Sequence, residues 1–492
     1  MKPTFRKSMI WLHTYTGLVG GWLLFAIFLT GTLSYYNAEF THWMTKSELN
    51  TQSQKKLVEQ GLDALKQKGP DAQRWYMGLP DDRGSTYYLS YQKGRSRESF
   101  TLDSQGSQVE KSADTRGGDF FRTFHYTILL RGWGGRYYTG VAAMLMLIGV
   151  FTGIYTHRRF FKDFFTLRPD KKRQFLTDFH AVSGIVTIPF CFVICLSALF
   201  IYINLYQPLT VSSYFDSYRD LDRQVSTGYP DSKPTDQQLM NGVDIEKIWQ
   251  QLPQYWGEEF AVSSVSIKHP LDRGAQIVVS RVKQENLSNK SESLAFDYLG
   301  NKLADMEDEN TARSIRRIFY GLHEAHFASP ALRAMLFILG LLSTVLISTG
   351  SIIWLEKRQS KVEKSVYHWV NKLNHACFYG LLFAIAAYLL VTKSGMSVSA
   401  ESIEIEVFLY SWLFCLTLCL LLSVEGIKPM LLKLNLLAYL TLFLLDIFGP
   451  NANLFSALSV FNVPHLTISL IMLLTCTWLA HGVYRGHRKL QA

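Results

Sequence analysis

The chain has 492 residues, of which 48% are hydrophobic and only 18% are charged. The charged fraction is below the roughly 25% that is typical of globular domains, yet the mean hydropathy is only +0.06. Such an average arises when strongly apolar segments alternate with long polar ones. The 25 Tyr, 32 Phe and 11 Trp exclude a disordered chain, and six Cys in so long a chain exclude a disulfide scaffold.

Apolar segments long enough to cross a bilayer recur along the chain. A bilayer core requires about 20 apolar residues of helix. Eight segments approach or exceed this length: 10–35, 137–156, 180–204, 331–354, 372–391, 407–424, 432–448 and 464–483. The first follows Lys2, Arg6 and Lys7, as a signal peptide would. It is too long for a signal sequence and has no small-residue cleavage site, which predicts an uncleaved anchor.

Basic residues predict the orientation, because short cytoplasmic loops of membrane proteins are rich in Lys and Arg. Three basic clusters and the N-terminus fall on one side of the membrane when all the spans are counted. The clusters run from Arg158 to Arg173, from Lys357 to Lys364 and from Arg485 to Lys489. Both termini are therefore predicted to be cytoplasmic. This distribution accounts for most of the net charge of +10 and argues against a nucleic-acid-binding protein.

The same count predicts the domain organisation. Two long polar inserts, residues 37–120 and 205–315, fall outside the cytoplasm, and each combines an amphipathic helical stretch with alternating, strand-like segments. The other segments are a first transmembrane helix (1–36), an interfacial helix with the second transmembrane helix (121–158), a basic cytoplasmic loop (159–178), a third transmembrane helix (179–204), an interfacial helix with the fourth (316–356), and a C-terminal four-helix extension (357–492). The sequence thus predicts a mainly α, polytopic membrane protein with about eight transmembrane helices and two small α+β inserts.

The first 358 residues contain an internal repeat. Residues 5–37 align without gaps to residues 172–204 at an offset of 167, so that His13 matches His180. The second span matches the fourth at an offset of 197, and His125 meets His323 after a one-residue gap. Because the first and third spans enter the membrane in the same direction, the repeat is parallel, with its axis along the membrane normal. Such a repeat brings equivalent residues to face each other at one depth.

The repeat-matched histidines fall at two depths. His13 and His180 lie about one turn inside the cytoplasmic ends of their helices, and His125 and His323 lie on the external side. Two imidazoles from facing helices make a six-coordinate site for a b-type haem iron, and two stacked sites would form an electron path across the bilayer. The four histidines are therefore candidate ligands of two haem b groups. Secondary candidates are His157, His326 and His375, together with Arg136 and Arg333, which would pair with haem propionates.

Simpler interpretations stand beside these. An interfacial His can merely hydrogen-bond at the headgroup level, and Arg136 and Arg333 can be snorkelling residues. Trp43 and Trp354 are first expected in the aromatic belts at the membrane surfaces. Asp446, the one notable acidic residue of the later helices, is expected to be an interfacial cap.

With its histidines in this order, the chain resembles the PepSY-associated transmembrane family, an iron-regulated inner-membrane family that includes the ferric-siderophore reductases. The resemblance covers roughly residues 5–390 and is carried by Trp11-Leu12-His13 through Gly17, Phe124-His125 with Gly135-Arg136, Thr152-Gly153, Phe179-His180 through Gly184, Leu322-His323, and Thr349-Gly350 with Trp354. It implies a four-helix core, PepSY-like periplasmic inserts, and haem held by His13, His125, His180 and His323. One departure is that Phe124-His125-Tyr126 stands where the family usually has Leu-His-Arg.

The function that the resemblance implies is an inner-membrane haem reductase of a bacterium. It would take electrons from a separate cytoplasmic or quinol donor and reduce a ferric siderophore, or another ferric chelate, in the periplasm. Reduction would release the iron because Fe(II) is softer than Fe(III) and holds hard oxygen ligands less well. No Gly-rich nucleotide-binding motif occurs in the sequence, so an NAD(P)H or flavin donor would be a separate protein.

Two other classes of function compete with a reductase. The inserts can be PepSY-type binding, sensing or peptidase-regulating modules on an inert membrane anchor, and such a protein needs no paired histidines. A transporter with a site at the membrane midplane is the third possibility. The first four spans contain no midplane Asp, Glu, Lys or Arg, which counts against a transport site there.

Overall fold

The computed structural model describes residues 4–45, 53–81, 83, 87–102, 115–157, 167–168, 172–206, 213–214, 216, 232–239, 243–282, 286–289, 291–305, 311–395 and 401–491. Most of the expected basic loop at 159–178 lies outside these residues. The chain divides into two compact units. The helical unit comprises Met1–Lys46, Thr115–Leu205 and Ala328–Ala492, and the sheet unit comprises Ser47–Asp114 and Tyr206–Phe327.

The helical unit contains the membrane spans. Its elements are α1 (Phe5–Ser34), α2 (Asn37–Met44), α4 (Asp119–Thr127), the 3-10 turn η2 (Arg131–Trp133), α5 (Gly135–Thr156), α6 (Lys172–Ile201), α12 (Pro330–Arg358), α13 (Lys364–Lys393), α14 (Glu401–Leu421), α15 (Val424–Phe448), α16 (Leu454–Ser459) and α17 (Val463–Gln491), with α7 (Ile203–Tyr206) at its boundary. Within the described residues, eight helices are long and apolar enough to cross a membrane: α1, α5, α6, α12, α13, α14, α15 and α17. The predicted number of spans is therefore confirmed, and the chain is a multi-pass membrane protein.

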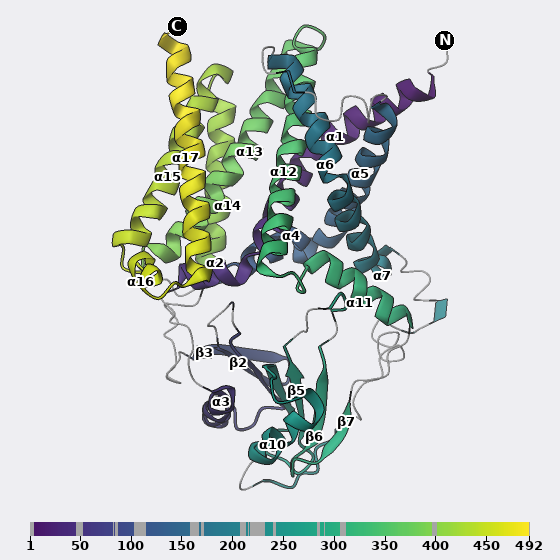
Figure 1. The fold of residues 1–492 in the computed structure, drawn as a ribbon, viewed down its shortest axis with the longest axis vertical. Helices are drawn as coiled ribbons and strands as arrows, with labels where there is room; N and C mark the ends of the chain where they lie inside the picture. The colour runs from purple at the N-terminus through teal and green to yellow at the C-terminus, as the bar shows by residue number, and fades with distance from the viewer. Residues whose placement is uncertain are drawn as a thin grey trace. The chain divides into compact units, whose positions relative to one another are not determined.

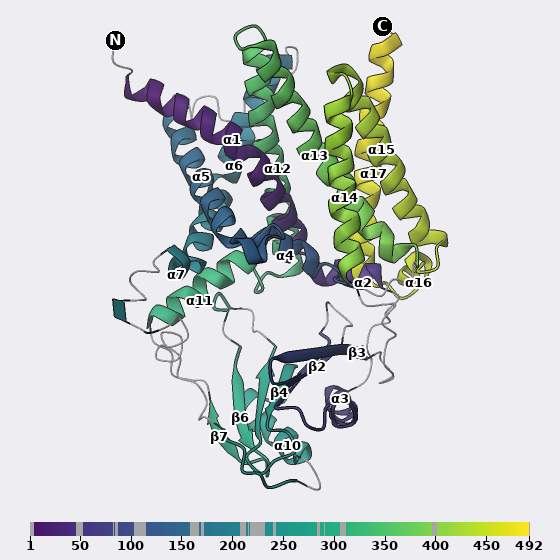
Figure 2. The same ribbon diagram turned by 180° about the vertical axis from the view of Figure 1, so that it is seen from behind.

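The long helices pack in two neighbouring groups. In the first group α1 packs against α5 and α12, and α6 packs against the same two helices; in the second, α13 packs against α14 and α15, and α15 packs against α17. The start of α1 and the end of α17 lie at the same end of the unit (Figure 1). The short helices α2, α4 and α16 lie at the opposite end (Figure 2).

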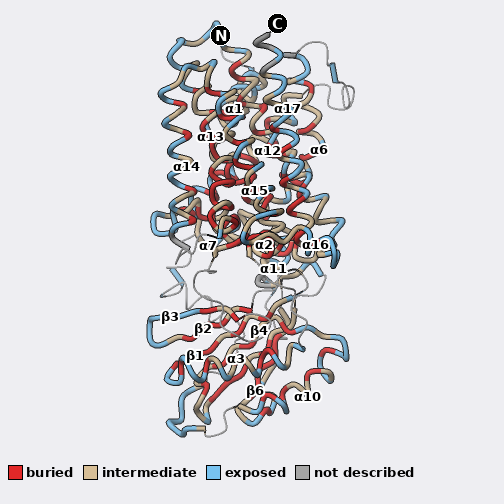
Figure 3. Tube along the Cα trace, turned by 90° about the vertical axis from the view of Figure 1, so that its left-hand side faces the viewer, coloured by how far each residue is buried: buried red, intermediate tan, exposed pale blue. Residues whose placement is uncertain are grey.

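Burial follows the pattern expected for helices in lipid. Buried residues run through the middle of the helical unit, whereas the outward faces of its helices are largely intermediate or exposed (Figure 3). Those outward faces carry large apolar side chains, such as Leu409, Leu413 and Phe414 of α14. A protein in water would bury such side chains, but a hydrocarbon environment tolerates them.

The sheet unit is built from both inserts. Its helices are α3 (Gln54–Lys68), α10 (Ile245–Trp256) and α11 (Thr311–Glu324). Its strands are β1 (Arg74–Gly78), β2 (Tyr87–Lys93), β3 (Ser96–Leu102), β4 (Val262–Lys268), β5 (Gln276–Arg281), β6 (Ser293–Asp297) and β7 (Lys302–Asp305). They form one antiparallel sheet in the order β3-β2-β1-β4-β5-β6-β7.

The sequence suggested two separate inserts, each with its own strands. In the structure the two inserts share one sheet instead. Strand β1 of the first insert pairs with β4 of the second, with Tyr76 opposite Ser266. The buried faces of α3 and α10, which carry Leu57 and Ile248, join the inward strand residues in a single apolar core. When β1 pairs with β4, each insert loses one exposed sheet edge. The joined sheet therefore leaves fewer backbone groups unpaired and buries more apolar surface than two separate sheets, which explains why the inserts combine.

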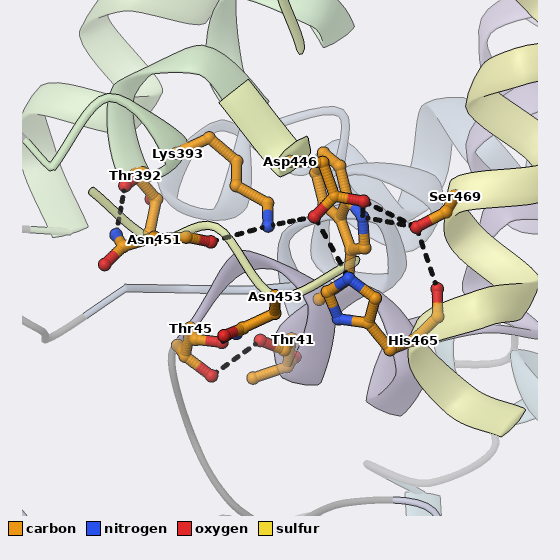
Figure 4. A network of polar contacts seen from close by, with 10 residues as sticks. Thr41, Thr45, Thr392, Lys393, Asp446, Asn451, Asn453, His465 and Ser469 are labelled. Atoms are coloured by element: carbon orange, nitrogen blue, oxygen red, sulfur yellow. Dashed lines mark hydrogen bonds and ion pairs between the residues drawn. The ribbon is translucent and has the colours of Figure 1, made fainter. Parts of the chain in front are cut away.

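Helix α2 is fixed to the second helix group by a buried charged network. Asp446 of α15 accepts hydrogen bonds from Lys393 Nζ at 2.7 Å, His465 Nε2 at 3.0 Å, Trp43 Nε1 at 3.0 Å and Ser469 Oγ at 2.6 Å (Figure 4). Trp43, Lys393 and Asp446 are all fully buried. The expectations that Asp446 is an interfacial cap and Trp43 a belt residue are therefore wrong, because each is the other's hydrogen-bond partner inside the protein.

A second contact of α2 holds a histidine in its neutral form. The backbone N–H of His465 donates to Oδ1 of Asn462 at 3.2 Å, which turns the amide nitrogen Nδ2 of Asn462 toward Nε2 of His42 at 2.9 Å. The His42 Nε2 atom must then accept, so this side chain has no proton there. Burial, with smaller contributions from His465 and Lys393, lowers the pKa of His42 to about 4.

Replacement of Lys393 by Met should destabilise the helical unit. The substitution leaves the Asp446 carboxylate buried without its main counter-ion, which costs about 3–5 kcal/mol for a pair of this kind. Thermal unfolding of the detergent-solubilised protein measures the loss. The double variant Lys393→Met/Asp446→Asn should recover much of it, because no buried charge remains; equal instability of the single and double variants would contradict this account.

The stability of the protein should also fall as the pH drops from about 6.5 to about 4, in part through His42. His42 takes up its proton near pH 4 in the folded state and near pH 6.5 in the unfolded chain. Between these values the unfolded state binds more protons, so a fall in pH stabilises the unfolded state relative to the folded one. Unfolding temperatures of wild type and His42→Gln, compared across this range, isolate the contribution. Glutamine accepts from Asn462 without titrating, so the variant should show the flatter profile.

Candidate functional site

His13 and His180 face each other inside the first helix group. Their ring centres are 6.4 Å apart and their planes are inclined at 72°. His13 lies on α1 and His180 on α6, and each ring packs against a glycine of the neighbouring helix. A Cβ atom on Gly153 would lie 3.2 Å from Cε1 of His13, and one on Gly350 would lie 3.3 Å from Cε1 of His180. Larger residues at these two positions would push the rings away.

His13 and His180, which we call the inner pair, make equivalent hydrogen bonds. His13 Nδ1 lies 3.0 Å from the Gly149 carbonyl oxygen and 3.1 Å from Thr152 Oγ1. His180 Nδ1 lies 3.1 Å from the Leu346 carbonyl oxygen and, like His13, 3.1 Å from a threonine Oγ1, that of Thr349. The contacted positions in α5 and α12 differ by the offset of 197 that relates the two helices in the sequence.

These bonds determine which nitrogen carries the proton. A carbonyl oxygen only accepts, so Nδ1 is the protonated nitrogen of both rings and Nε2 carries a lone pair. No hydrogen bond to Nε2 of His13 or His180 occurs among the residues that the structure describes. An imidazole with its Nδ1–H bound to a carbonyl is the usual form of a metal-ligating histidine.

The spacing of the inner pair fits two ligands on opposite sides of one iron. A bond from a metal to an imidazole nitrogen is about 2 Å long, so two such rings on one iron have centres about 6.3 Å apart. The observed 6.4 Å agrees with this value. Two imidazoles fill two of six positions, and the four nitrogens of a porphyrin fill the others. The distance between the two rings is therefore compatible with two histidines that would hold one haem iron.

The ring of His125, a third candidate histidine of the helical unit, has a similar environment. His125, on α4, donates from Nδ1 to the Ile27 carbonyl oxygen of α1 at 2.8 Å. Its ring lies so close to Gly31 that a Cβ atom there would be 2.6 Å from Nδ1. Burial lowers the pKa of His125, which keeps the ring neutral. Nε2 is therefore the nitrogen that carries the lone pair in this ring too.

The other predicted residues do not join the inner pair. His323 lies in the last turn of α11 in the sheet unit, and its pairing with His125 stays a prediction. His326, in the same unit, packs edge-on against Phe327. His157 caps the end of α5, and His375 stacks on Tyr379 within α13.

The two arginines, which are equivalent in the sequence repeat, differ in the structure. Arg333 pairs with the buried carboxylate of Glu39 at 3.3 Å and donates to the Ala328 carbonyl oxygen at 3.2 Å. The Arg136 guanidinium instead lies over the Tyr126 ring, 5.5 Å from its centre. Arg333 therefore already has a carboxylate partner, which weakens its candidacy for a propionate.

Sequence reasoning missed the residues that hold the start of α4. Glu404 of α14 accepts from Thr115 Oγ1 at 2.6 Å and from the Arg116 backbone N–H at 3.0 Å. Tyr388 of α13 donates to the Gly117 carbonyl oxygen at 2.8 Å, and its ring stacks on Phe120 at 4.2 Å. The signal in the sequence was Glu404, an acidic residue near the start of an apolar run. Such a position is typical of a residue at the end of a helix.

Comparison with known proteins supplies the family. The model of the PepSY-associated TM region matches residues 10–357, which is more than two thirds of the chain and covers α5, α6 and nearly all of α1 and α12. A search of curated proteins finds no match. The matched region contains both histidines of the inner pair and both glycines that pack against them. The chain belongs to the PepSY-associated transmembrane family.

Proposed function

We propose that this protein is an inner-membrane haem reductase that passes electrons across the membrane to a ferric siderophore, or a similar ferric chelate, in the periplasm. The observation that carries the proposal is the inner pair: two neutral imidazoles whose Nε2 atoms are available and whose ring centres are 6.4 Å apart. Ionisable side chains in a membrane are costly and are retained for function. Haem b would supply one-electron chemistry at this level and at a second, external level.

The residues of the chain hold and orient the proposed ligands. Thr152 and the Gly149 carbonyl fix the ring of His13, and the equivalent atoms of α12 fix that of His180. The same contacts at matching offsets support a duplicated, parallel arrangement of the first four spans, in which equivalent residues meet at one depth. The external level would use His125 and His323. A neutral, well-oriented imidazole needs little rearrangement when the iron changes its oxidation state.

The orientation and partners follow from the same scheme. With both termini in the cytoplasm, the inner pair lies near the cytoplasmic side, where a separate cytoplasmic or quinol donor would deliver electrons. The external histidines would then face the periplasmic substrate. Reduction to Fe(II) weakens a siderophore's hold on its iron, since its hard oxygen ligands prefer Fe(III).

Loss of either inner histidine should remove one of two haems. Substitution of His13 or His180 by Ala would take away one of the two imidazoles that would hold the haem iron. A pyridine haemochrome assay on purified protein gives the ratio of haem to chain, and the Soret band gives the ligation state. His481→Ala, at an exposed position on α17, is the matched control and should keep the wild-type ratio. Wild-type protein without a Soret band would refute the proposal.

Substitution of Gly31 by Ala should disturb the external haem and spare the inner one. The new Cβ atom would lie 2.6 Å from Nδ1 of His125, so the ring has to move away from the Ile27 carbonyl. Gly486→Ala on α17 is the control, since a Cβ atom there meets nothing within 4 Å. Redox titration followed in the α-band should show one component altered in Gly31→Ala and none in the control. Identical titrations would contradict a role for His125.

The alternative function, a PepSY-type binding or peptidase-regulating module on an inert anchor, predicts a different result. The sheet unit has its own apolar core, which is compatible with a binding role for the inserts. Under this alternative, a variant with Ala in place of the four proposed ligands would keep its function in iron-limited cells. The four residues are His13, His125, His180 and His323. The reductase proposal requires that this variant fail to support siderophore reduction.

A further inference from the structure

Two buried hydrogen-bond donors without acceptors lie between α1, α12 and α13. Trp354 of α12 is only 6% exposed, and its Nε1–H has no acceptor among the described residues. Asn374 of α13 is 3% exposed; its Oδ1 accepts from Trp22 Nε1 at 2.8 Å and from Ser351 Oγ at 2.7 Å, while its Nδ2 has no acceptor there either. A buried donor without an acceptor is unfavourable, so each of the two indicates an acceptor group.

A cation next to Trp354 shows what kind of acceptor fits. The Arg358 guanidinium, one helical turn further along α12, lies 5.1 Å from the centre of the Trp354 ring and 6.0 Å from that of Tyr15. Within the described parts of the chain, Arg358 makes no ion pair with a carboxylate. Its planar set of five N–H donors suits a carboxylate or a phosphate. The combination of an indole N–H and a guanidinium therefore favours an oxyanion.

The position of this cluster links it to the inner histidine pair. Trp354 follows Gly350 by four residues, which places it on nearly the same helix face about 6 Å further along the axis. Gly350 is the residue against which the His180 ring packs. Tyr15, whose ring faces Arg358, lies two residues after His13 on α1. The oxyanion site is thus about one helical turn along α12 from the glycine against which the His180 ring packs.

From this geometry we infer that Trp354 Nε1 and the Arg358 guanidinium bind a propionate carboxylate of the inner haem. The inference rests on the proposed function, because it requires a haem between His13 and His180. A phosphate of an anionic phospholipid headgroup has the same chemistry and would reach the same end of α12. The carboxylate is favoured because Trp354 is deeply buried, in a cluster with Leu18 and Val370, whereas a headgroup stays at the membrane surface.

The test uses full-length protein carrying His125→Ala, so that only the inner haem contributes. Trp354→Phe removes the N–H and keeps a ring, and Arg358→Gln removes the charge. Loss of one hydrogen bond to a charged group costs about 1.5–3 kcal/mol, so haem transfer to excess apomyoglobin should be roughly tenfold faster or more in each variant. The propionate bending bands in the resonance Raman spectrum should shift, and Arg358→Gln should lower the midpoint potential.

Matched controls remove the same groups elsewhere. Trp369→Phe changes an exposed tryptophan of α13, and Lys361→Gln removes an exposed cation just after α12. Both should transfer haem at the parent rate with unshifted bands. Arg358→Lys keeps a charge but not the planar donor set, and its haem transfer should be intermediate.

Each other outcome contradicts the inference in a recognisable way. Unchanged haem transfer and Raman bands, with less co-purified anionic phospholipid detected by mass spectrometry, would assign the site to a headgroup. Unchanged haem and unchanged lipid would mean that the donors bind neither. In both cases the reductase proposal survives, because the haem is present. A parent protein without haem would instead overturn the proposed function and, with it, this inference.

Discussion

The hydrogen bond from an imidazole Nδ1–H to a helix carbonyl is the interaction on which the site depends. It occurs at His13, His180 and His125, with lengths between 2.8 and 3.1 Å. In each case it fixes the ring's orientation and leaves the lone pair on Nε2. Glycine makes this possible, because the ring occupies the volume that a side chain on Gly153, Gly350 or Gly31 would fill. The close packing of the imidazole ring on a glycine and the position of its proton on Nδ1 therefore depend on each other.

The two halves of the first helix group agree at the histidines and differ around them. Arg333 is bound to Glu39, whereas Arg136 lies over an aromatic ring. Trp354 lies at the position that corresponds, at the offset of 197, to His157. Differences of this kind place unlike charges and donors around a symmetric histidine pair.

The C-terminal extension acts on the two segments that flank the first insert. Asp446 and His465 fix α2, which leaves the end of α1, through Trp43. Glu404 and Tyr388 fix the segment that leads into α4 and so to His125. The helices whose role the sequence did not reveal therefore support the position of His125. Buried ion pairs contribute little net stability but define a unique arrangement, which suits a positioning role.

The sequence by itself determined the features that depend on local composition and on duplication. Long apolar runs fixed the number of spans, and the offsets of 167 and 197 matched His13 with His180 and Gly153 with Gly350. The tertiary structure alone decided which of these residues meet: it joined the strands of both inserts through β1 and β4, and it buried Trp43 beside Asp446. The physical reason is that hydropathy records how apolar a segment is. The pairing of a carboxylate, an indole or a strand edge depends instead on groups far apart in the chain, such as Trp43 and Asp446, which are separated by 403 residues.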